Sequence, residues 1–317
     1  MVEAARSIFR PRSGDSAGQE PASPLACLDR LPHVDQPFQE WVTRAPVGRL
    51  RPFVDRYLGY RLVGFPAGLH RGVPSRHMTF IVSIGPSIDV VTQTNPAQHQ
   101  QSYRTVLSGL QASAALIAHN GNQQGVAIEL TPLGSRALVG LPAGELWDLS
   151  LEFADVVGAA GGELWDRLQV AAGWDERFAV CDEVLSRLAG QDAVASELQH
   201  CWGTLVASGG RISMTDLAAE TGYSRQHLGR RFRHEFGLSP KLAARVVRFE
   251  RARRMLQSVS SFVSISQVAV SCGYYDQAHL NRDFIELAGC TPTEIVSEEL
   301  PFFQDDRAPR ASQLLHA

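Results

Sequence analysis

The C-terminal third of the sequence contains an internal repeat, and this repeat limits what that part of the chain can fold into. The segment GYSRQHLGRRF (residues 222–232) returns as GYYDQAHLNRDF (273–284). A His-Leu pair, an arginine and a phenylalanine recur at an offset of 52: His227, Leu228, Arg230 and Phe232 return as His279, Leu280, Arg282 and Phe284. A repeated unit of this length predicts one supersecondary element that is used twice.

The first copy has the start and stop signals of two short helices. Ser213 or Thr215 can cap the first helix. Gly222 ends it, because glycine adopts the left-handed backbone conformation without a steric penalty. Ser224 can cap a second helix over residues 225–236. Two short helices joined by such a turn predict a helix-turn-helix.

The second helix of this copy has one apolar face and one polar face. Leu228, Phe232 and Phe236 recur every four positions and are expected to face the core. The remaining surface carries amide and guanidinium groups, from Arg225, Gln226, Arg230 and Arg233. In the major groove of DNA, arginine pairs with guanine and glutamine pairs with adenine. The same arginines could form an ordinary solvated helix face, but the duplication favours DNA recognition.

The second copy repeats this pattern. Its expected interior residues are Val268, Ala269, Cys272, Leu280 and Phe284. Its outward-facing residues are Gln277, His279 and Arg282, and Asp276 is the expected cap of a reading helix over 276–288. Acidic residues are more frequent here than in the first copy, at Asp276, Asp283 and Glu286. We therefore expect the second helix to form fewer base contacts and more contacts to the DNA backbone.

A further helix is predicted between the two copies, over residues 241–257. It has an apolar stripe, formed by Leu242, Val246, Phe249, Met255 and Leu256. Arginines are expected to cover its other side, at Arg245, Arg248, Arg251, Arg253 and Arg254. They could contact DNA phosphates or pair with acidic residues of the chain. A helix of this length spans about 25 Å, so it could hold the two reading helices about one DNA turn, roughly 34 Å, apart.

Upstream of the repeat, the sequence predicts a domain of a different kind. Residues 1–36 mix proline, glycine, serine and charge without a period, which predicts a flexible leader. Short apolar runs separated by turn residues then predict five strands, at 77–85, 88–93, 104–110, 114–119 and 125–132. Strands at this spacing favour an antiparallel barrel or sandwich.

The segment between this β-rich region and the repeat has helical periodicity. Its apolar residues form stripes, at Leu164, Leu168, Phe178, Cys181, Leu185 and Leu188. These stripes could form a homodimer interface or pack against the barrel, and the pattern fits both. The predicted fold is therefore a multidomain α+β protein. It has an N-terminal antiparallel β barrel or sandwich of the cupin-like kind, a helical linker, and an all-α C-terminal domain with two helix-turn-helix motifs.

Composition excludes several other classes of protein. The chain has 317 residues with a net charge of −3, and no apolar run approaches the roughly 18 residues of a membrane span. Its five cysteines, at positions 27, 181, 201, 272 and 290, form no closely spaced pair, which predicts reduced thiols in the cytoplasm. Within residues 211–296, arginine and lysine outnumber aspartate and glutamate by 12 to 8. This bias is mild and does not indicate DNA binding on its own.

The repeat and its surroundings resemble a known family. GYSRQHLGRRFRHEFGLSPK, followed by RFERARRML, ISQVAVSCGYYDQAHLNRDF and GCTP, is similar to the AraC/XylS-type DNA-binding domain. The resemblance implies base contacts at Gln226, Gly229 and Arg230 in the first reading helix. In the second it implies contacts at Gln277, His279 and Arg282. Gly229 departs from the pattern because it has no side chain to read a base.

The N-terminal part resembles the sensory half of actinobacterial AraC-type regulators. The similar segments are RPFVDRYLGYR, HRGVPSRHMTFIVSIG and GVAIELTPLGSRALVGLP. Predicted boundaries are a leader at 1–36, a sensory domain at 37–145, a helical linker at 146–208, a DNA-binding domain at 209–299 and a tail at 300–317. Within the DNA-binding domain, the two motifs are expected at 215–236 and 266–288. The expected partners are double-stranded promoter DNA, RNA polymerase, a small-molecule effector and a second copy of the chain, with no membrane partner.

Other functions have less support in the sequence. The histidines of the N-terminal region, at positions 33, 70, 77, 99 and 119, show no tight ligand spacing and no adjacent carboxylates, so no metal or other cofactor is expected. No nucleophile elbow, dinucleotide motif or phosphate loop predicts an enzyme. A DNA-alkylation repair protein would need a cysteine cluster or a reactive Pro-Cys-His motif, and an architectural DNA protein would be more basic. The sequence thus predicts a non-enzymatic, sequence-specific transcription regulator whose N-terminal domain responds to an effector or partner.

Overall fold

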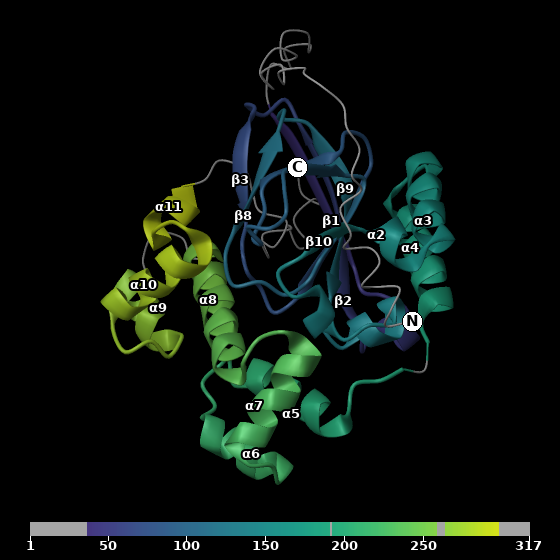
Figure 1. The fold of residues 1–317 in the computed structure, drawn as a ribbon. Helices are drawn as coiled ribbons and strands as arrows, with labels where there is room; N and C mark the ends of the chain where they lie inside the picture. Colours follow the sequence, from purple (N-terminus) through teal and green to yellow (C-terminus); the bar gives the residue numbers. More distant parts are fainter. Residues whose placement is uncertain (1–36, 191, 259–263, 298–317) are drawn as a thin grey trace, which may run out of the picture. The chain divides into compact units, whose positions relative to one another are not determined.

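The computed structural model describes residues 37–190, 192–258 and 264–297. The predicted leader and tail, together with Cys27, lie outside these residues. Antiparallel strands form the first part of the described chain, and helices form the second (Figure 1). This order confirms the predicted α+β class.

The strands form two antiparallel sheets. One has six strands in the order β1-β2-β9-β4-β7-β10, with bounds Phe38–Arg44, Val54–Val63, Gln123–Leu130, Met78–Ser83, Thr105–Ser108 and Ser150–Glu152. The other has four strands in the order β3-β8-β5-β6, with bounds Gly68–Gly72, Ala115–His119, Ile88–Thr92 and Gln101–Tyr103. All five strands predicted from apolar runs are present, as β4, β5, β7, β8 and β9. Apolar runs did not predict β1, β2, β3, β6 and β10, several of which mix polar with apolar residues.

Register in the centre of the larger sheet brings distant residues together. In the pairing of β4 with β9, Thr79 lies opposite Glu129. The pairing of β2 with β9 is interrupted by an irregularity between Val54 and Tyr57. Such a bulge redirects the side chains within it. Asp55 and Arg56, the two residues in this interruption, lie near β4 and β9 at one side of the sheet.

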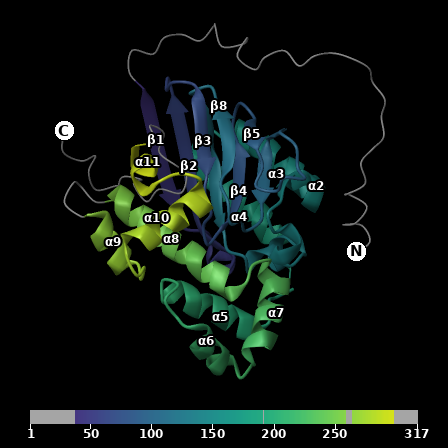
Figure 2. The ribbon, with the colours of Figure 1, turned by 60° about the vertical axis from the view of Figure 1, so that its left-hand side comes forward.

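Three helices follow the sheets: α2 (Phe153–Val157), α3 (Ala159–Val170) and α4 (Trp174–Leu188). Leu164, Leu168 and Phe178 belong to the same buried cluster as residues of β2 and β4. The ring of Phe178 stacks on that of Tyr57 with centroids 5.9 Å apart, and the Tyr57 hydroxyl donates to Asp182 over 2.9 Å. The apolar stripes therefore pack against the β-rich part, which was one of the two alternatives that the sequence left open. Figure 2 shows α3 and α4 from a second side.

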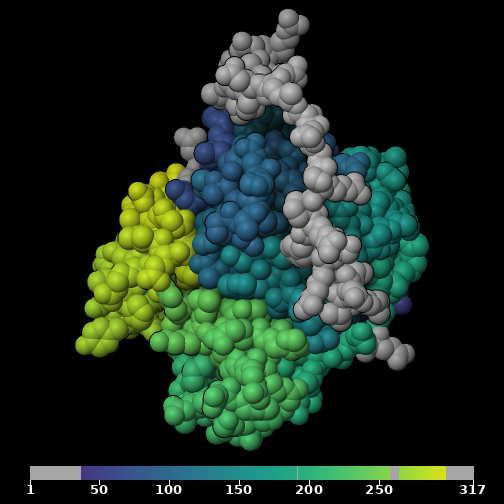
Figure 3. Space-filling model, viewed as in Figure 1, coloured from purple at the N-terminus to yellow at the C-terminus, as the bar shows by residue number. Residues whose placement is uncertain are grey.

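The C-terminal helices contain the repeated motif. Their bounds are α5 Ser196–Ala207, α6 Met214–Thr221, α7 Arg225–Phe236, α8 Pro240–Ser258, α9 Ile265–Ser271, α10 Gln277–Ala288 and α11 Pro292–Ser297. α6 with α7 and α9 with α10 form the two predicted pairs, while α8 joins them. Figure 3 shows the surfaces of these segments in green to yellow.

Buried aromatic rings hold each pair in place. Phe232 and Phe236 of α7 contact each other with centroids 4.6 Å apart, and Trp202 of α5 packs on both rings. In the second pair, Phe284 of α10 meets Phe249 of α8 edge to face at 4.8 Å. These phenylalanines are the ones that the four-residue spacing assigned to the interior.

The β-rich part also contacts the end of α7 directly. Arg136, in a short π-helical segment (Ser135–Val139), donates two hydrogen bonds to Glu235, of 2.7 and 2.8 Å. Glu235 is only 4 % exposed. A side chain at Gly144 would meet the carbonyl oxygen of His234, because an added Cβ would lie 2.3 Å from that oxygen. Gly144 therefore allows close packing on α7.

We predict that Phe284→Ala destabilises the second helix pair. Phe284 is 0 % exposed, so its removal should lower the free energy of unfolding by about 3–5 kcal/mol. Ile285→Ala is the matched control, because Ile285 is on the same helix and is 55 % exposed. Chemical denaturation followed by circular dichroism would measure both variants. Equal effects of the two substitutions would contradict the assigned burial.

We also predict that Glu235→Gln weakens the packing of α7 on the β-rich part. The substitution removes the charge that pairs with Arg136 while keeping the size of the side chain, and we expect a loss of about 1–3 kcal/mol. Glu183→Gln is the control, since Glu183 forms an exposed pair with Arg167 and such pairs contribute little. Thermal unfolding of the full chain would compare them. A loss for Glu183→Gln as large as that for Glu235→Gln would refute the prediction.

Candidate functional site

The first candidate site is the exposed face of the two predicted reading helices, α7 and α10. Side-chain caps fix where both helices begin. The Ser224 hydroxyl accepts the backbone N–H of His227 over 3.2 Å, and Asp276 accepts that of His279 over 2.7 Å. The preceding helix α6 is capped by Ser213, which accepts the N–H of Asp216, rather than by the alternative Thr215. Gly222 ends α6 with φ of 69°, in the left-handed region as predicted.

The residues predicted to read DNA from α7 lie on its surface. Arg225, Gln226, Arg230 and Arg233 are all exposed. Arg230 approaches the imidazole Nδ1 of His227 at 3.3 Å. Among the described residues, the structure records no side-chain hydrogen bond or ion pair for Arg225, Gln226 and Arg233. Gly229 lies between them with no atom within 4 Å of the position of a Cβ, so this part of the helix surface is open.

On α10 the predicted residues differ in accessibility. Gln277 and Arg282 are exposed, whereas His279 is half-buried. The His279 ring meets Tyr274 edge to face at 5.2 Å. The Gln277 side chain accepts a hydrogen bond from Ser266 over 2.7 Å, so that contact would have to rearrange for Gln277 to read a base. Tyr275, which sequence reasoning did not single out, precedes the helix and is 91 % exposed.

The acidic side chains of the second copy form contacts within the chain. Asp283 is 3 % exposed and accepts two hydrogen bonds from Arg245 of α8, of 3.0 and 2.8 Å. Glu286 also pairs with Arg245, and Asp276 is the N-cap. These interactions occupy the acidic side chains, which weakens the argument that they would reduce base contacts by α10.

Four of the five arginines of α8 form hydrogen bonds or ion pairs within the chain, which favours one of the two alternatives that the sequence left open for them. Arg245 joins α8 to α10, and Arg248 donates to the carbonyl of Gly210 over 2.7 Å. Arg254 pairs with Glu250 one turn earlier. Arg253 is 0 % exposed and donates to Gln257 over 2.8 Å. The expectation that all five arginines cover the outer side of the helix is therefore wrong for Arg253.

The second candidate site is a cavity of about 230 Å³ between the β-rich part and α8. Its apolar wall includes Phe80, Ile81, Ile88, Ile117 and Ile128. Its charged residues are Asp55, Arg56, Arg71, Arg76, His77, Glu129, Glu250 and Arg254. Sequence reasoning missed this site because its residues come from strands and a helix that are far apart in the chain.

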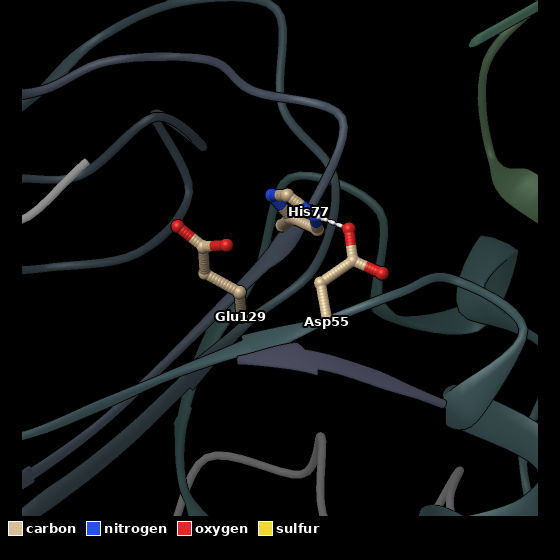
Figure 4. A group of neighbouring side chains, drawn as sticks. All are labelled: Asp55, His77 and Glu129. Atoms are coloured by element: carbon tan, nitrogen blue, oxygen red, sulfur yellow. Dashed lines mark hydrogen bonds and ion pairs between the residues drawn. The ribbon is translucent and has the colours of Figure 1, made fainter. Parts of the chain in front are cut away.

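Three side chains at this cavity form a group with metal-ligand chemistry (Figure 4). Asp55, His77 and Glu129 each offer one ligand atom, and these atoms lie within 4.8 Å of one another. His77 Nε2 and Asp55 Oδ2 are 2.6 Å apart, and this hydrogen bond is the main reason that the pKa of Asp55 lies below its ordinary value. From the sequence, no carboxylate was expected beside a histidine. That expectation is wrong in the fold, because strand pairing places β2, β9 and β4 side by side.

Arginines already neutralise the carboxylates of this group. Arg56 pairs with Glu129 at 2.7 Å, and Arg76 approaches Asp55 at 3.5 Å. Glu250 accepts the backbone N–H of Arg76 over 2.9 Å and its guanidinium over 3.4 Å. Burial acts to raise the pKa of Glu250, but the charges of Arg76 and Arg254 outweigh this effect and hold the pKa below its ordinary value.

A second histidine, His70, lines the same cavity. Its ring lies 5.6 Å from that of His119 on the paired strand β8. Burial, with a smaller contribution from His119, lowers the pKa of His70 to about 3. His70 is therefore neutral at physiological pH and adds no charge to the cavity.

Comparisons with known proteins agree with the helical region. Residues 217–297 match the family model of a helix-turn-helix domain. A comparison with curated protein sequences found no match. A solved transcriptional regulator with an AraC-type DNA-binding domain, from Chromobacterium violaceum, is 28 % identical over 32 % of this chain and 88 % of its own, with a TM-score of 0.29.

Two further solved structures are similar to larger or smaller parts of the chain. The C-terminal domain of AraT, a response regulator from Geobacillus stearothermophilus, is 19 % identical over 35 % of this chain and 95 % of its own, with a TM-score of 0.31. ToxT from Vibrio cholerae is 11 % identical over 83 % of this chain and 98 % of its own, with a TM-score of 0.44. In the part of the chain that the structure describes, no helix has the length and apolar character needed to span a bilayer. The family match and the two capped helix pairs together identify the C-terminal part of this chain as a helix-turn-helix domain.

Proposed function

We propose that this protein is a transcription regulator that binds a specific double-stranded promoter sequence, with α7 and α10 in two successive major grooves. The observation that carries the proposal is the pair of similarly capped helices, each with exposed glutamine and arginine side chains. α8 separates the two pairs by 19 residues of helix, or about 28 Å. One turn of DNA is about 34 Å, so a spacer of this length fits two reading helices on one side of the duplex.

The predicted site residues of the two helices differ in how well they are placed to contact bases. Arg230 is the best placed base reader on α7, because it is exposed and approaches only a histidine of its own helix. Arg282 is its counterpart on α10. Arg225 and Arg233 fit contacts with bases or with flanking phosphates. Gln226 and Gln277 fit adenine, and His279 has the least freedom because its ring packs on Tyr274.

The described cysteines do not favour the alternative of a protein that accepts alkyl groups. Cys181, Cys201, Cys272 and Cys290 are all buried. Burial raises the pKa of Cys201 to about 11 and also raises the pKa of Cys181 and Cys272. Thiols in such surroundings are poor nucleophiles.

We predict that Arg230→Ala weakens specific DNA binding and relaxes specificity. Loss of a bidentate base contact should lower the affinity for the preferred duplex by about 1–3 kcal/mol and leave non-specific binding nearly unchanged. The preferred duplex would be selected from a random library with the full chain, and affinities measured at one fixed salt concentration. Arg187→Ala is the control, since Arg187 lies on α4 and pairs with Glu163. An equal loss on every duplex would instead assign Arg230 to phosphate binding.

We also propose that the β-rich domain controls the DNA-binding domain by binding an effector or partner. The support for this is the contact between the two parts. Arg136 donates two hydrogen bonds to Glu235 of α7, and Gly144 packs against the end of the same helix. A change in the β-rich domain can therefore alter the position of a reading helix. A ligand could use this connection by binding one arrangement better than the other.

Gly144→Ala tests the connection. Its methyl group would collide with the carbonyl of His234, so we expect at least a threefold change in specific DNA affinity. Gly162→Ala is the control, because a Cβ at Gly162 has no atom within 4 Å. Fluorescence anisotropy with the preferred duplex would measure both. Unchanged affinity in Gly144→Ala, with an unchanged melting temperature, would argue against control through this contact.

A further inference from the structure

We propose that α10 reads thymine methyl groups in its major groove, through three exposed residues, Tyr275, Ala278 and Ile285, which form the apolar edge of α10. This proposal rests on the proposed function and deepens it, because it assigns a base preference to the half of the binding site under α10. Three observations support it: the loss of polar side chains at two reading positions, the exposure of the side chains that replace them, and one aromatic residue added in the turn before the helix.

The repeat shows which positions of α10 correspond to reading positions of α7. At the offset of 52 that relates the two copies, Gln226 corresponds to Ala278, and Arg233 corresponds to Ile285. The first copy therefore presents an amide and a guanidinium group where the second copy presents two hydrocarbon side chains. The arginine between these positions is kept, as Arg282 in α10.

Ala278, Arg282 and Ile285 lie along one face of α10. Their spacing of four and then three residues places them in one row on a helix. Ala278 and Ile285 are both exposed, whereas Leu280 and Phe284 are buried on the other side. Apolar side chains therefore flank the arginine that is proposed to read a base from this helix.

Tyr275 is the residue that the second copy adds in its turn. The segment between the turn glycine and the helix cap has one residue in the first copy and two in the second. Tyr223 packs edge to face on His227 with centroids 4.8 Å apart, and Tyr274 packs on His279 in the same way at 5.2 Å. Tyr274 is therefore the counterpart of Tyr223. The added ring of Tyr275 has no counterpart and is 91 % exposed.

The turn fixes the position of Tyr275 at the beginning of α10. On one side, the backbone N–H of Tyr274 donates to the carbonyl of Ala269 over 2.9 Å. On the other side, Asp276 caps the helix by accepting the backbone N–H of His279 over 2.7 Å. In a helix-turn-helix, the N-terminal residues of the reading helix approach the base edges. The exposed ring therefore belongs to the end of α10 that enters the groove.

A thymine methyl group is the partner whose chemistry fits the apolar edge. Among the four bases, only thymine presents a methyl group in the major groove, and alanine and other apolar side chains contact it there. Contact with Ala278 or Ile285 removes apolar surface of both partners from water. Arg282 lies between these two residues, and charged residues are depleted in the core of protein–protein interfaces. The edge therefore fits a base pair better than it fits a partner protein.

The two halves of the binding site should then differ in sequence. Gln226, Arg230 and Arg233 of α7 suit adenine, guanine and phosphate. On α10, Arg282 suits guanine, while the apolar edge suits A·T pairs whose thymine methyl groups face the helix. The protein should therefore prefer an asymmetric site, with thymine required in one half only.

Deoxyuridine tests the methyl contact, because it lacks the methyl group of thymine and keeps its hydrogen-bonding groups. The preferred duplex would be selected from a random library with the full chain, and each thymine would then be replaced singly by deoxyuridine. We expect at least one replacement, confined to one half of the site, to lower the affinity about threefold or more. Affinity that no deoxyuridine replacement changes, or equal losses in both halves, would overturn the proposal.

Ile285→Ala assigns the contact to α10. This variant should lower the affinity for the thymine duplex about threefold or more, and should bind the duplex with deoxyuridine at the sensitive position as the wild type does. Ile285→Val keeps most of the apolar surface and should keep the sensitivity to deoxyuridine. Val170→Ala is the matched control, because Val170 is an aliphatic residue of α3 that is 81 % exposed. It should leave both affinities within about twofold of the wild-type values.

Two variants separate the ring of Tyr275 from its hydroxyl group. Tyr275→Ala should weaken binding to the preferred duplex, whereas Tyr275→Phe keeps the ring and should bind as the wild type does. An equal loss in both variants would assign the hydroxyl to a polar contact and refute the role of the ring. Deoxyuridine sensitivity that is unchanged in both Ile285→Ala and Tyr275→Ala would refute the apolar edge as a whole.

The same measurements separate this proposal from the proposed function. Absence of any preferred duplex would refute the proposed function itself. A preferred duplex whose affinity depends on Arg230 but on no thymine methyl group would refute the apolar edge and leave DNA recognition intact. Unchanged DNA affinity in Ile285→Ala and Tyr275→Ala, together with reduced promoter output in cells, would also refute it and assign the apolar edge to a partner protein.

Discussion

The arrangement of the C-terminal half depends on one helix, α8, which belongs to the core of both motifs. Its residues Ala243, Ala244 and Val247 lie in the cluster that includes Phe232 and Phe236, and its Val246, Phe249 and Ala252 lie in the cluster that includes Phe284. A single helix with two apolar faces is therefore shared by two small helix pairs that could bury little surface alone. Because an α-helix resists bending, the two exposed reading faces keep a nearly fixed separation.

Arginine occupies two different kinds of surroundings in this half of the molecule. Arg245, Arg248, Arg253 and Arg254 lie along α8 and bind acceptors within the chain, which orients neighbouring helices. Arg225, Arg230 and Arg233 lie on α7, where the structure records no acidic partner among the described residues. The planar guanidinium suits both purposes, since its donors match carboxylates inside the protein and guanine or phosphate outside it. Partner geometry, and not the number of arginines, distinguishes the arginines that bind acceptors within the chain from those proposed to contact DNA, and this is why overall charge was a weak guide.

Local patterns in the sequence predicted local structure well. Four-residue spacing identified Phe232 and Phe284 as interior, and Ser224 and Asp276 were recognised as caps, because both signals depend on residues within one or two turns of a helix. No comparable pattern in the sequence indicates which distant segments are in contact. Nothing near Glu235 indicates that Arg136 lies beside it, and the acidic character of Asp283 suggested an exposed position although Arg245 buries it. The group of Asp55, His77 and Glu129 depends on strand order and on an irregular pairing, which periodicity does not reveal.

The cavity and the reading helices can influence each other only if the contacts between them are close to balanced. A very strong connection would hold one arrangement whatever the ligand, and a very weak one would transmit nothing. The contacts of Arg76 with Glu250 fall between these limits, since one backbone hydrogen bond is short while the guanidinium contacts are long. Glu250 is also paired with Arg254, so this buried carboxylate does not depend on Arg76 alone, and an unpaired buried charge would be strongly unfavourable. The contacts of Arg76 and Arg254 with Glu250 therefore join the β-rich part to α8 through a carboxylate that is paired on both sides.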